Sequence, residues 1–304
     1  MFGWRADGRA IRGVDPIVML TPYIMPTRVD AQVNIRLNLD FDVMTQYIRR
    51  KREEGIAITY MGLILAAYVR TVAQYPELNR FIMNKRLYAR NHLCVSFVTL
   101  KKSNDEQIEE SVVKLEFDPE DTIFDVSQKL DAAIEKTRAP KDKNRTDVLA
   151  RFLLSVPLLP NIVVGLARLL DRYGLMPALI HKASPFHTSL FISNMASIGM
   201  NYIYHHIYNF GTTGVFVSMG KTESDVRVNA DGSCRSQRIM PLGVVVDERI
   251  CSGGVYSRAF GFLRSALAHP ETLEERPPDV KFETKMSRRS GGAQINAYRE
   301  DKAD

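Results

Sequence analysis

The chain has 304 residues, of which 45% are hydrophobic and 25% are charged. This is the composition of a globular protein, and the length is enough for one large domain with a substantial core. The net charge of +6 comes from 41 basic and 35 acidic residues. The basic runs at 49–52 and 141–145 have no interleaved aromatic residues on which bases would stack, so we expect no nucleic-acid partner.

The cysteines and the N-terminus limit the compartment. Cys94, Cys234 and Cys251 are an odd number without C-x-x-C spacing, which favours neither a disulfide framework nor a structural zinc site. Residues 1–8 carry charges and no apolar run, which is unlike a secretory signal. We therefore expect a cytoplasmic protein.

The first elements are a strand and two helices. Residues 31–39 alternate between apolar and polar side chains, the period of a half-buried strand. A helix with a basic end is expected at 41–53, closed by Gly55. Thr59 then begins an almost wholly apolar helix at 60–73, and its lack of a broad polar face predicts that it is buried.

A turn and a hairpin follow. Residues 76–79 end the second helix, and Asn84 with Lys85 separates two short apolar segments as a hairpin turn does. Asp121 is expected to cap a helix with apolar residues at helical spacing from Ile123 to Ile134. Two strands are expected before it, at 91–100 and 107–116.

An apolar stretch spans 152–167, uncharged between Arg151 and Arg168. It is shorter than the roughly 20 residues that a spanning helix needs, and it contains Pro157 and Pro160. We interpret it as a pair of short buried helices and keep a surface-lying membrane contact as the lesser alternative, so a membrane partner is not expected.

The last third returns to strands and ends on a helix. The strands are expected at 187–194, 213–220, 224–229 and 234–246, with a tight turn at 229–232. A helix at 254–268 stops before Pro270. Interleaved helices and strands predict an α/β protein with a mixed β-sheet. Residues 1–278 form one domain in this interpretation, and 279–304 form a polar, flexible tail.

One segment carries a recognisable motif. Residues 240–254 run from an apolar strand through a polar turn into a helix. They resemble the D-H-R-x-x-D-G signature of the acyltransferase component of 2-oxo-acid dehydrogenase complexes and the H-H-x-x-x-D-G of chloramphenicol acetyltransferases. Asp247 and Gly253 match the first aspartate and the glycine. Glu248 stands at the position of the catalytic histidine, and Ser252 at that of the second aspartate.

Further blocks resemble the same superfamily in the same order. They are residues 33–39, 76–79, 191–195, 204–220 and 240–242, so the resemblance covers about residues 10–275. It implies a two-layer sandwich of the chloramphenicol acetyltransferase type in a homotrimer. Two departures are expected: an added apolar helical segment at about 146–186, and no lipoyl-bearing domain, which favours a free-standing protein.

The resemblance also implies a chemistry. In these acyltransferases an imidazole deprotonates the acceptor, and a hydroxyl holds the oxyanion formed from the thioester. Ser193 matches the hydroxyl position, and the resemblance implies that it meets residue 248 across a subunit boundary. The co-substrate would be an acyl-coenzyme A thioester. The alternative for Ser193 is a hydrogen bond to a neighbouring strand.

Glu248 has two mutually exclusive interpretations. Arg12 matches the arginine that pairs with the motif aspartate in the family, and Glu248 replaces that partner in one hypothesis, forming a structural ion pair. In the other, Glu248 is the general base, which requires its pKa to rise from about 4.3 toward 6 or 7 through burial away from cations.

Histidines at 181, 187, 205 and 206 lie near Ser193 in sequence. Adjacent residues of a strand point to opposite faces, so at most one of His205 and His206 would enter a given pocket. The four lack a clear third or fourth ligand, and we expect no metal. The sequence thus predicts an acyltransferase-like protein. The alternative is a catalytically inactive relative that binds a ligand or acts as a scaffold.

Overall fold

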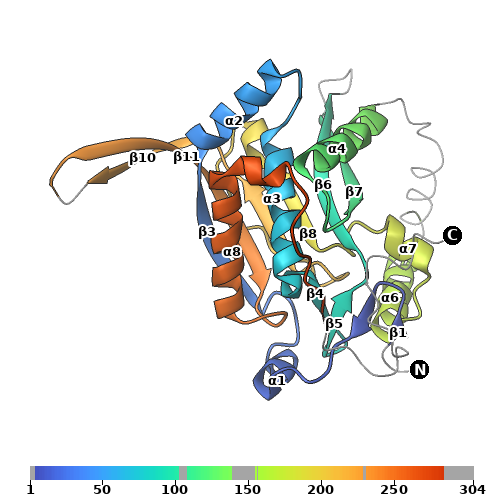
Figure 1. Cartoon of the computed structure of the whole chain (residues 1–304). Helices are drawn as coiled ribbons and strands as arrows, with labels where there is room; N and C mark the ends of the chain where they lie inside the picture. Colours follow the sequence, from blue (N-terminus) through green and yellow to red (C-terminus); the bar gives the residue numbers. More distant parts are fainter. Residues whose placement is uncertain (1–3, 103–107, 139–154, 156, 229–230, 284–304) are drawn as a thin grey trace.

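A seven-stranded mixed sheet forms the centre of the computed structural model, which describes residues 4–102, 108–138, 155, 157–228 and 231–283 (Figure 1). The strand order is β10, β11, β9, β8, β6 and β7, and β3 also pairs with β11. Only β8 runs parallel to its neighbours, β6 and β9. The strands are β3 (Gln32–Asp40), β6 (Leu93–Lys102), β7 (Ile108–Phe117), β8 (Leu190–Asn194), β9 (Val215–Met219), β10 (Glu223–Val228) and β11 (Cys234–Asp247).

A smaller antiparallel sheet lies beside it, in the order β1, β2, β5 and β4. Its strands are β1 (Trp4–Arg5), β2 (Gly8–Ala10), β4 (Arg80–Met83) and β5 (Arg86–Arg90). The turn between β4 and β5 is the predicted hairpin: Asn84 and Lys85 have positive φ angles of 48° and 59°. Asparagine tolerates this conformation better than most residues, which explains the turn at this point.

Four helices cover one face of the large sheet, and the main hydrophobic core lies between them and the strands (Figure 1). They are α2 (Phe41–Glu53), α3 (Tyr60–Gln74), α4 (Ile123–Arg138) and α8 (Gly253–Ala268). Three further helices lie at the edge: α1 (Pro16–Ile24), α6 (Leu159–Tyr173) and α7 (Ala178–Ala183). Short 3-10 turns are η1 (Pro76–Asn79), η2 (Met195–Ile198) and η3 (Pro270–Leu273). The predicted α/β sandwich with a mixed sheet is confirmed.

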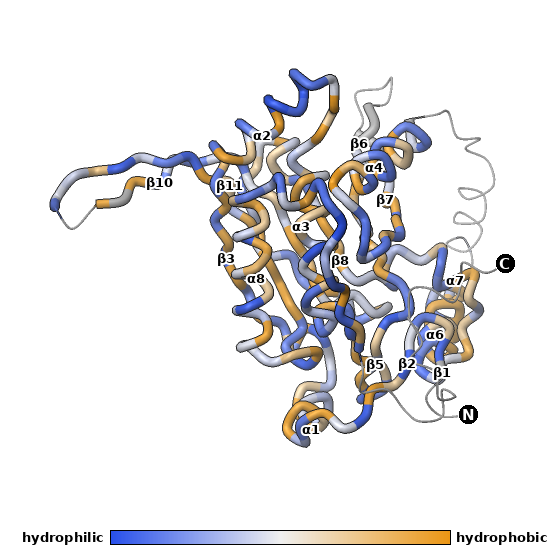
Figure 2. The backbone as a smooth tube through the Cα atoms, viewed as in Figure 1, coloured by the Kyte–Doolittle hydropathy of each residue, from blue (hydrophilic) through white to orange (hydrophobic). Residues whose placement is uncertain are grey.

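Local signals explain the first elements. Leu37 and Leu39 of β3 are buried as the alternation predicts. Asp40 ends the strand, and its carboxylate accepts hydrogen bonds from the backbone of α2. Thr59 caps α3 through the amide of Gly62. α3 is buried around its middle, as its apolar sequence predicts (Figure 2).

An extended segment at 201–210 packs on the other face of the sheet, against β8 and β9. Ile207 and Tyr208 of this segment pack on Phe191 and Phe216 of the strands. The segment crosses close to Gly243, where a Cβ atom would lie 2.3 Å from a backbone oxygen. Only glycine fits this crossing. The segment forms no strand, and the predicted strand at 213–220 corresponds to β9, Val215–Met219.

Two helix predictions are wrong. Residues 157–173 do not form short buried helices: α6 is one surface helix in which Asp171 is the only buried residue. Pro160 lies in its first turn, where proline leaves no hydrogen bond unmade, so it begins the helix and does not break it. Residues 152–154 and 156 lie outside the described residues. None of the described helices combines the length and apolar character needed to cross a bilayer.

The second correction concerns the start of α4. Thr122 and Asp125 form the reciprocal hydrogen bonds of a capping box, in which the Thr122 amide binds Asp125 Oδ2 at 2.9 Å. The carboxylate of Asp121 instead accepts from the amide of Asp118 and from Lys129. Thr122 is therefore the cap, and Asp121 closes the preceding turn.

A two-stranded ribbon projects from the body (Figure 1). It consists of β10 and the first residues of β11, 234–238, which pair with β10 alone, whereas Ile239 to Asp247 pair with β3. Residues 229–230 of the predicted turn and the tail from 284 lie outside the described residues.

Candidate functional site

The turn after β11 is built on a buried ion pair. Arg249 binds both oxygens of Asp247, with Nε and Nη2 each 2.7 Å from a carboxylate oxygen. The Asp247 side chain is fully buried and that of Arg249 nearly so. Tyr256 of α8 donates a hydrogen bond to the Asp247 carbonyl at 2.8 Å, and Arg249 also binds the Met25 carbonyl. A bidentate pair of this kind fixes the course of the chain through the motif.

Glu248 lies between these two buried residues and points outward. Its backbone amide donates to the Ala31 carbonyl at 2.9 Å, and its side chain is exposed in the single chain. The Arg12 side chain is exposed as well. No ion pair joins Glu248 to Arg12 within the described part of this one chain, so their pairing stays a prediction for an assembly.

The two remaining motif positions lie at the start of α8. Ser252 is the residue before the helix, is exposed, and forms no side-chain capping hydrogen bond. Gly253 is the first helical residue, with open space where a Cβ atom would be. The ion pair that stiffens this turn is thus made by Asp247 with Arg249, and Ser252 contributes no charge to it.

Ser193 lies near the end of β8, and its hydroxyl oxygen is buried without a hydrogen-bond partner in the part of the chain that the structure describes. Leaving a buried hydroxyl unpaired costs about 1–3 kcal/mol. The prediction that Ser193 hydrogen-bonds to a neighbouring strand therefore finds no support here. The described residues therefore give this hydroxyl no structural role.

Ser193 and Glu248 do not meet within one chain. Ser193 pairs with Ser218 of β9, and Ser218 pairs with Gly243 of β11. Glu248 follows Gly243 by five residues along an extended strand, which places it about 17 Å further along the sheet. Only a second copy could bring a Glu248 side chain to this Ser193.

Next to the motif turn lies a basic cavity of about 400 Å³. Arg28 and Arg249 form its inner wall, and the exposed Arg168 and Arg172 of α6 its outer wall. Burial lowers the pKa of Arg28 to about 10, although the Asp247 carboxylate opposes this shift. The Nε atom of Arg28 is buried and unpartnered among the described residues. The cavity suits an anionic group. Its remaining lining residues are Pro26, Thr27, Ile82, Met83, Asn84, Lys85, Asp171, Asn209, Phe210 and Gly211.

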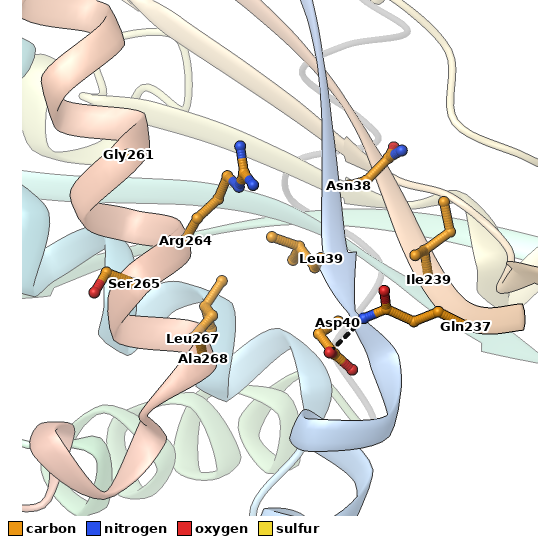
Figure 3. A pocket seen from close by; sticks show the side chains of 10 residues that line it. All are labelled: Asn38, Leu39, Asp40, Gln237, Ile239, Gly261, Arg264, Ser265, Leu267 and Ala268. Carbon is orange, nitrogen blue, oxygen red and sulfur yellow. Dashed lines mark hydrogen bonds between the residues drawn. The ribbon is translucent and has the colours of Figure 1, made fainter. Parts of the chain in front are cut away.

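A second cavity, of about 520 Å³, lies between β3, β11 and α8 (Figure 3). Leu39 of β3 points toward Arg264 of α8, and Gln237 donates a hydrogen bond to Asp40 at 2.5 Å. None of the predicted site residues lines it. It contains a mixture of apolar and polar groups, among them Ser265 and Asp40.

The four histidines divide into two pairs. Residues 201–210 do not form a strand, so His205 and His206 do not point to opposite faces. Their ring centroids are 4.8 Å apart. His181 and His187 are buried, with rings 4.6 Å apart near edge-to-face. Burial lowers the pKa of His181 to about 4.

Sequence reasoning missed the buried partner of Asp247 and the burial of Arg28. Arg249 was part of the motif but was not recognised as the partner of Asp247, although the D-x-R spacing places both in one turn. Arg5 and Asp7 form a buried ion pair with the same separation in reverse order, between the end of β1 and the turn that follows it. Arg28 carries no local pattern that reveals its burial, since it contacts residues far away in sequence.

The fold is similar to those of solved acyltransferases. A probable dihydrolipoamide acetyltransferase from Listeria monocytogenes is 11% identical with a TM-score of 0.54, over 89% of this chain and 97% of that one. The dihydrolipoamide acetyltransferase of Azotobacter vinelandii is 13% identical with a TM-score of 0.54, over 84% and 88%. A chloramphenicol acetyltransferase is 12% identical with a TM-score of 0.50, over 86% and 99%.

At the level of sequence, no family model matches the chain, and no curated protein matches it. The likeness therefore lies in the arrangement of strands and helices. This chain has the fold of the chloramphenicol acetyltransferase and dihydrolipoamide acyltransferase catalytic domains, in a divergent form.

Proposed function

We propose that the protein transfers an acyl group from an acyl-coenzyme A thioester to a small acceptor, at a site shared by two copies of a homotrimer. The observation that carries this proposal is the buried, unpartnered hydroxyl of Ser193, at the position that the resemblance assigns to the oxyanion donor. The acyltransferase fold supports the same reaction class.

In this reaction Glu248 of one copy takes the proton of the acceptor hydroxyl, amine or thiol. The acceptor atom forms a bond to the thioester carbonyl carbon, and the carbonyl oxygen becomes an oxyanion that accepts a hydrogen bond from Ser193 of the next copy. Collapse of the intermediate breaks the carbon–sulfur bond. The coenzyme A thiolate leaves and takes the proton held by Glu248.

The basic cavity supports an anionic donor. It lies against the motif turn through Arg249, and its outer wall carries the exposed Arg168 and Arg172. Nε of Arg172 donates a hydrogen bond to Asn84 Oδ1 at 3.0 Å. Guanidinium groups bind phosphates bidentately. We assign this cavity to the phosphate groups of coenzyme A.

The test is a thioester-cleavage assay with a panel of acyl-coenzyme A donors and small amine, alcohol and thiol acceptors. Loss of an oxyanion donor lowers kcat by roughly 10²–10³-fold, so Ser193→Ala is expected to show this loss while remaining folded. Glu248→Gln tests the base and is expected to abolish turnover without unfolding the protein. Sedimentation measures whether the folded protein is a trimer.

The exposed position of Glu248 in the single chain favours one other candidate, a catalytically inactive relative that binds its ligand in the same cavities. A flat response in every donor and acceptor combination, with coenzyme A still raising the thermal midpoint, would establish that candidate and remove the enzymatic one. Turnover that survives Ser193→Ala unchanged would exclude the assigned oxyanion donor.

A further inference from the structure

A second cluster of polar side chains is buried beneath α6 and α7. Asp171 lies near the end of α6, His181 lies on α7, and His187 lies in the turn before β8. All three are buried, and one ligand atom from each lies within 4.8 Å of the others. Two imidazoles and one carboxylate are a typical ligand set for divalent transition metals.

Two of these side chains are held by the atoms that a metal would not use. Nδ1 of His187 lies 2.7 Å from the hydroxyl of Ser184, which leaves Nε2 facing Asp171 Oδ2 at 3.2 Å. The other oxygen of Asp171 accepts a hydrogen bond from Arg5 at 2.5 Å. Such outer contacts orient the ligands of metal sites and fix the histidine tautomer.

His181 is the side chain that the fold leaves unexplained. It is only 5% exposed, and neither of its ring nitrogens has a hydrogen-bond partner among the described residues. Nδ1 lies 3.5 Å from Asp7 Oδ2 without forming a hydrogen bond. A metal bound at Nε2 would satisfy one nitrogen and leave the Nδ1 proton directed at Asp7, the usual carboxylate–histidine–metal arrangement.

Two buried carboxylates lie beside the site. Arg5 forms ion pairs with both Asp7 and Asp171. The buried Arg90 also interacts with Asp7 electrostatically, while its guanidinium donates hydrogen bonds to Thr212. The nearby ammonium of Lys114 is directed at the backbone, where it donates to the carbonyls of His181 at 2.7 Å and of Ser184 at 3.2 Å. It thereby fixes the turn that carries the ligands. An anion would meet both carboxylates, which argues against an anionic ligand here.

We propose that Asp171, His181 and His187 bind a divalent first-row transition-metal ion of the Zn²⁺ type. Tetrahedral bonds of about 2.1 Å place ligand atoms about 3.4 Å apart. Asp171 and His187 already have nearly this spacing, at 3.2 Å. The widest separation in the set would close by about 1.4 Å at most.

The site has room for a further ligand. Three protein ligands leave at least one coordination position open. Both histidines line a cavity of about 370 Å³, so that position faces a space large enough for water or a small molecule. The metal site lies apart from Ser193, because His187 precedes β8 and Ser193 lies near the opposite end of that strand. It shares Asp171 with the lining of the basic cavity, so metal binding is measured directly and not through acyl transfer.

The experiment uses the full chain, free of tags and treated with chelator. Co²⁺ is titrated by visible absorption and Zn²⁺ by calorimetry. One ion per chain is expected, with a d–d band from Co²⁺ and a raised thermal midpoint with either metal. His181→Phe keeps an aromatic ring against His187 and removes both nitrogens. It is expected to weaken binding by roughly 100-fold or more, and Ser184→Ala by roughly 10–100-fold.

The matched control is the double variant His205→Gln and His206→Gln, which removes the other histidine pair and should bind the metal as the wild type does. Absence of stoichiometric binding to the wild type overturns the proposal. So does binding that survives His181→Phe but is lost in the double variant. Circular dichroism confirms folding. If His181→Phe does not fold, wild-type affinity of Ser184→Ala overturns the proposal.

Discussion

Ser193 and Ser218 are directly paired on neighbouring strands, yet only Ser218 uses its hydroxyl in the fold. Ser218 Oγ accepts a hydrogen bond from the Ile203 amide at 3.0 Å and donates to the Ile203 carbonyl. These bonds fasten the extended segment to the sheet. The Ser193 hydroxyl is also buried but forms no such hydrogen bond. Ser218 therefore has a structural role, whereas Ser193 remains the candidate catalytic serine.

The first prediction compares alanine at the two positions. Ser218→Ala leaves the Ile203 amide without its acceptor and is expected to lower the free energy of unfolding by about 1–3 kcal/mol. Ser193→Ala removes an unpaired hydroxyl, so the free energy of unfolding should stay constant or rise by up to about 1 kcal/mol. Urea denaturation measures both. Equal losses in the two variants would show that Ser193 has a structural partner.

The second prediction concerns the buried ion pair of the motif turn. Asp247→Asn leaves the Arg249 guanidinium buried without its counter-charge and is expected to cost about 3–5 kcal/mol of stability. Asp42→Asn, in the exposed pair with Arg238, is the control and should cost at most about 1 kcal/mol. A small loss for Asp247→Asn would mean that water reaches the turn.

The third prediction tests the basic cavity. Replacing both Arg168 and Arg172 with glutamine removes two exposed guanidinium groups without touching Arg28 or Arg249. Each charge-assisted phosphate contact contributes about 1.5–3 kcal/mol, so KM for acyl-coenzyme A should rise by at least roughly 10-fold at constant kcat. Arg49→Gln on α2 serves as the control. An unchanged KM would place the phosphates elsewhere.

The fourth prediction concerns acid stability in metal-free buffer. Burial lowers the pKa of His181 to about 4, from about 6.5 in the unfolded chain. Between these values the unfolded state binds a proton that the folded state does not. The stabilisation is complete above pH 6.5 and falls by up to about 1.4 kcal/mol per pH unit as the pH drops toward 4.

His181→Phe removes this titration and should flatten the fall in unfolding free energy between pH 6.5 and 4. His206→Gln, at an exposed histidine, should leave the slope as it is in the wild type. Denaturant midpoints at half-unit pH steps measure the slopes. Parallel curves for wild type and His181→Phe would contradict the assignment of the slope to His181.

Much of the fold was predictable because it rests on short-range patterns. The Thr59 cap of α3 and the turn at Asn84 each report a local preference, and both are confirmed. The alternation in β3 is confirmed for Leu37 and Leu39, whereas Val33 at the start of the strand is exposed. The prediction for α6 was wrong because most of its apolar side chains are exposed, whereas the charged Asp171 is buried. Hydrophobicity alone cannot reveal such a helix.

The candidate site was predictable only in part. The motif placed Asp247 at the end of a strand, Glu248 in the turn after it and Gly253 at the start of a helix, because these residues are close in sequence. The sequence predicts no metal, because the histidines show no third ligand at a suitable spacing; in the structure Asp171 of a separate helix lies close to His181 and His187. Contacts between distant elements, and any contact between copies, leave no spacing pattern in one sequence.

The two parts of β11 differ in stability, because they differ in burial and in the strands that they pair with. From Ile239 onward β11 is buried between other strands, whereas 234–238 are largely exposed and joined to β10 alone. A lone two-stranded ribbon is marginally stable in water. The register of the outer part is therefore set by the part of β11 that is fixed in the large sheet. Local opening of the ribbon would leave the hydrophobic core intact, and its strands would pair again from the inner end outward.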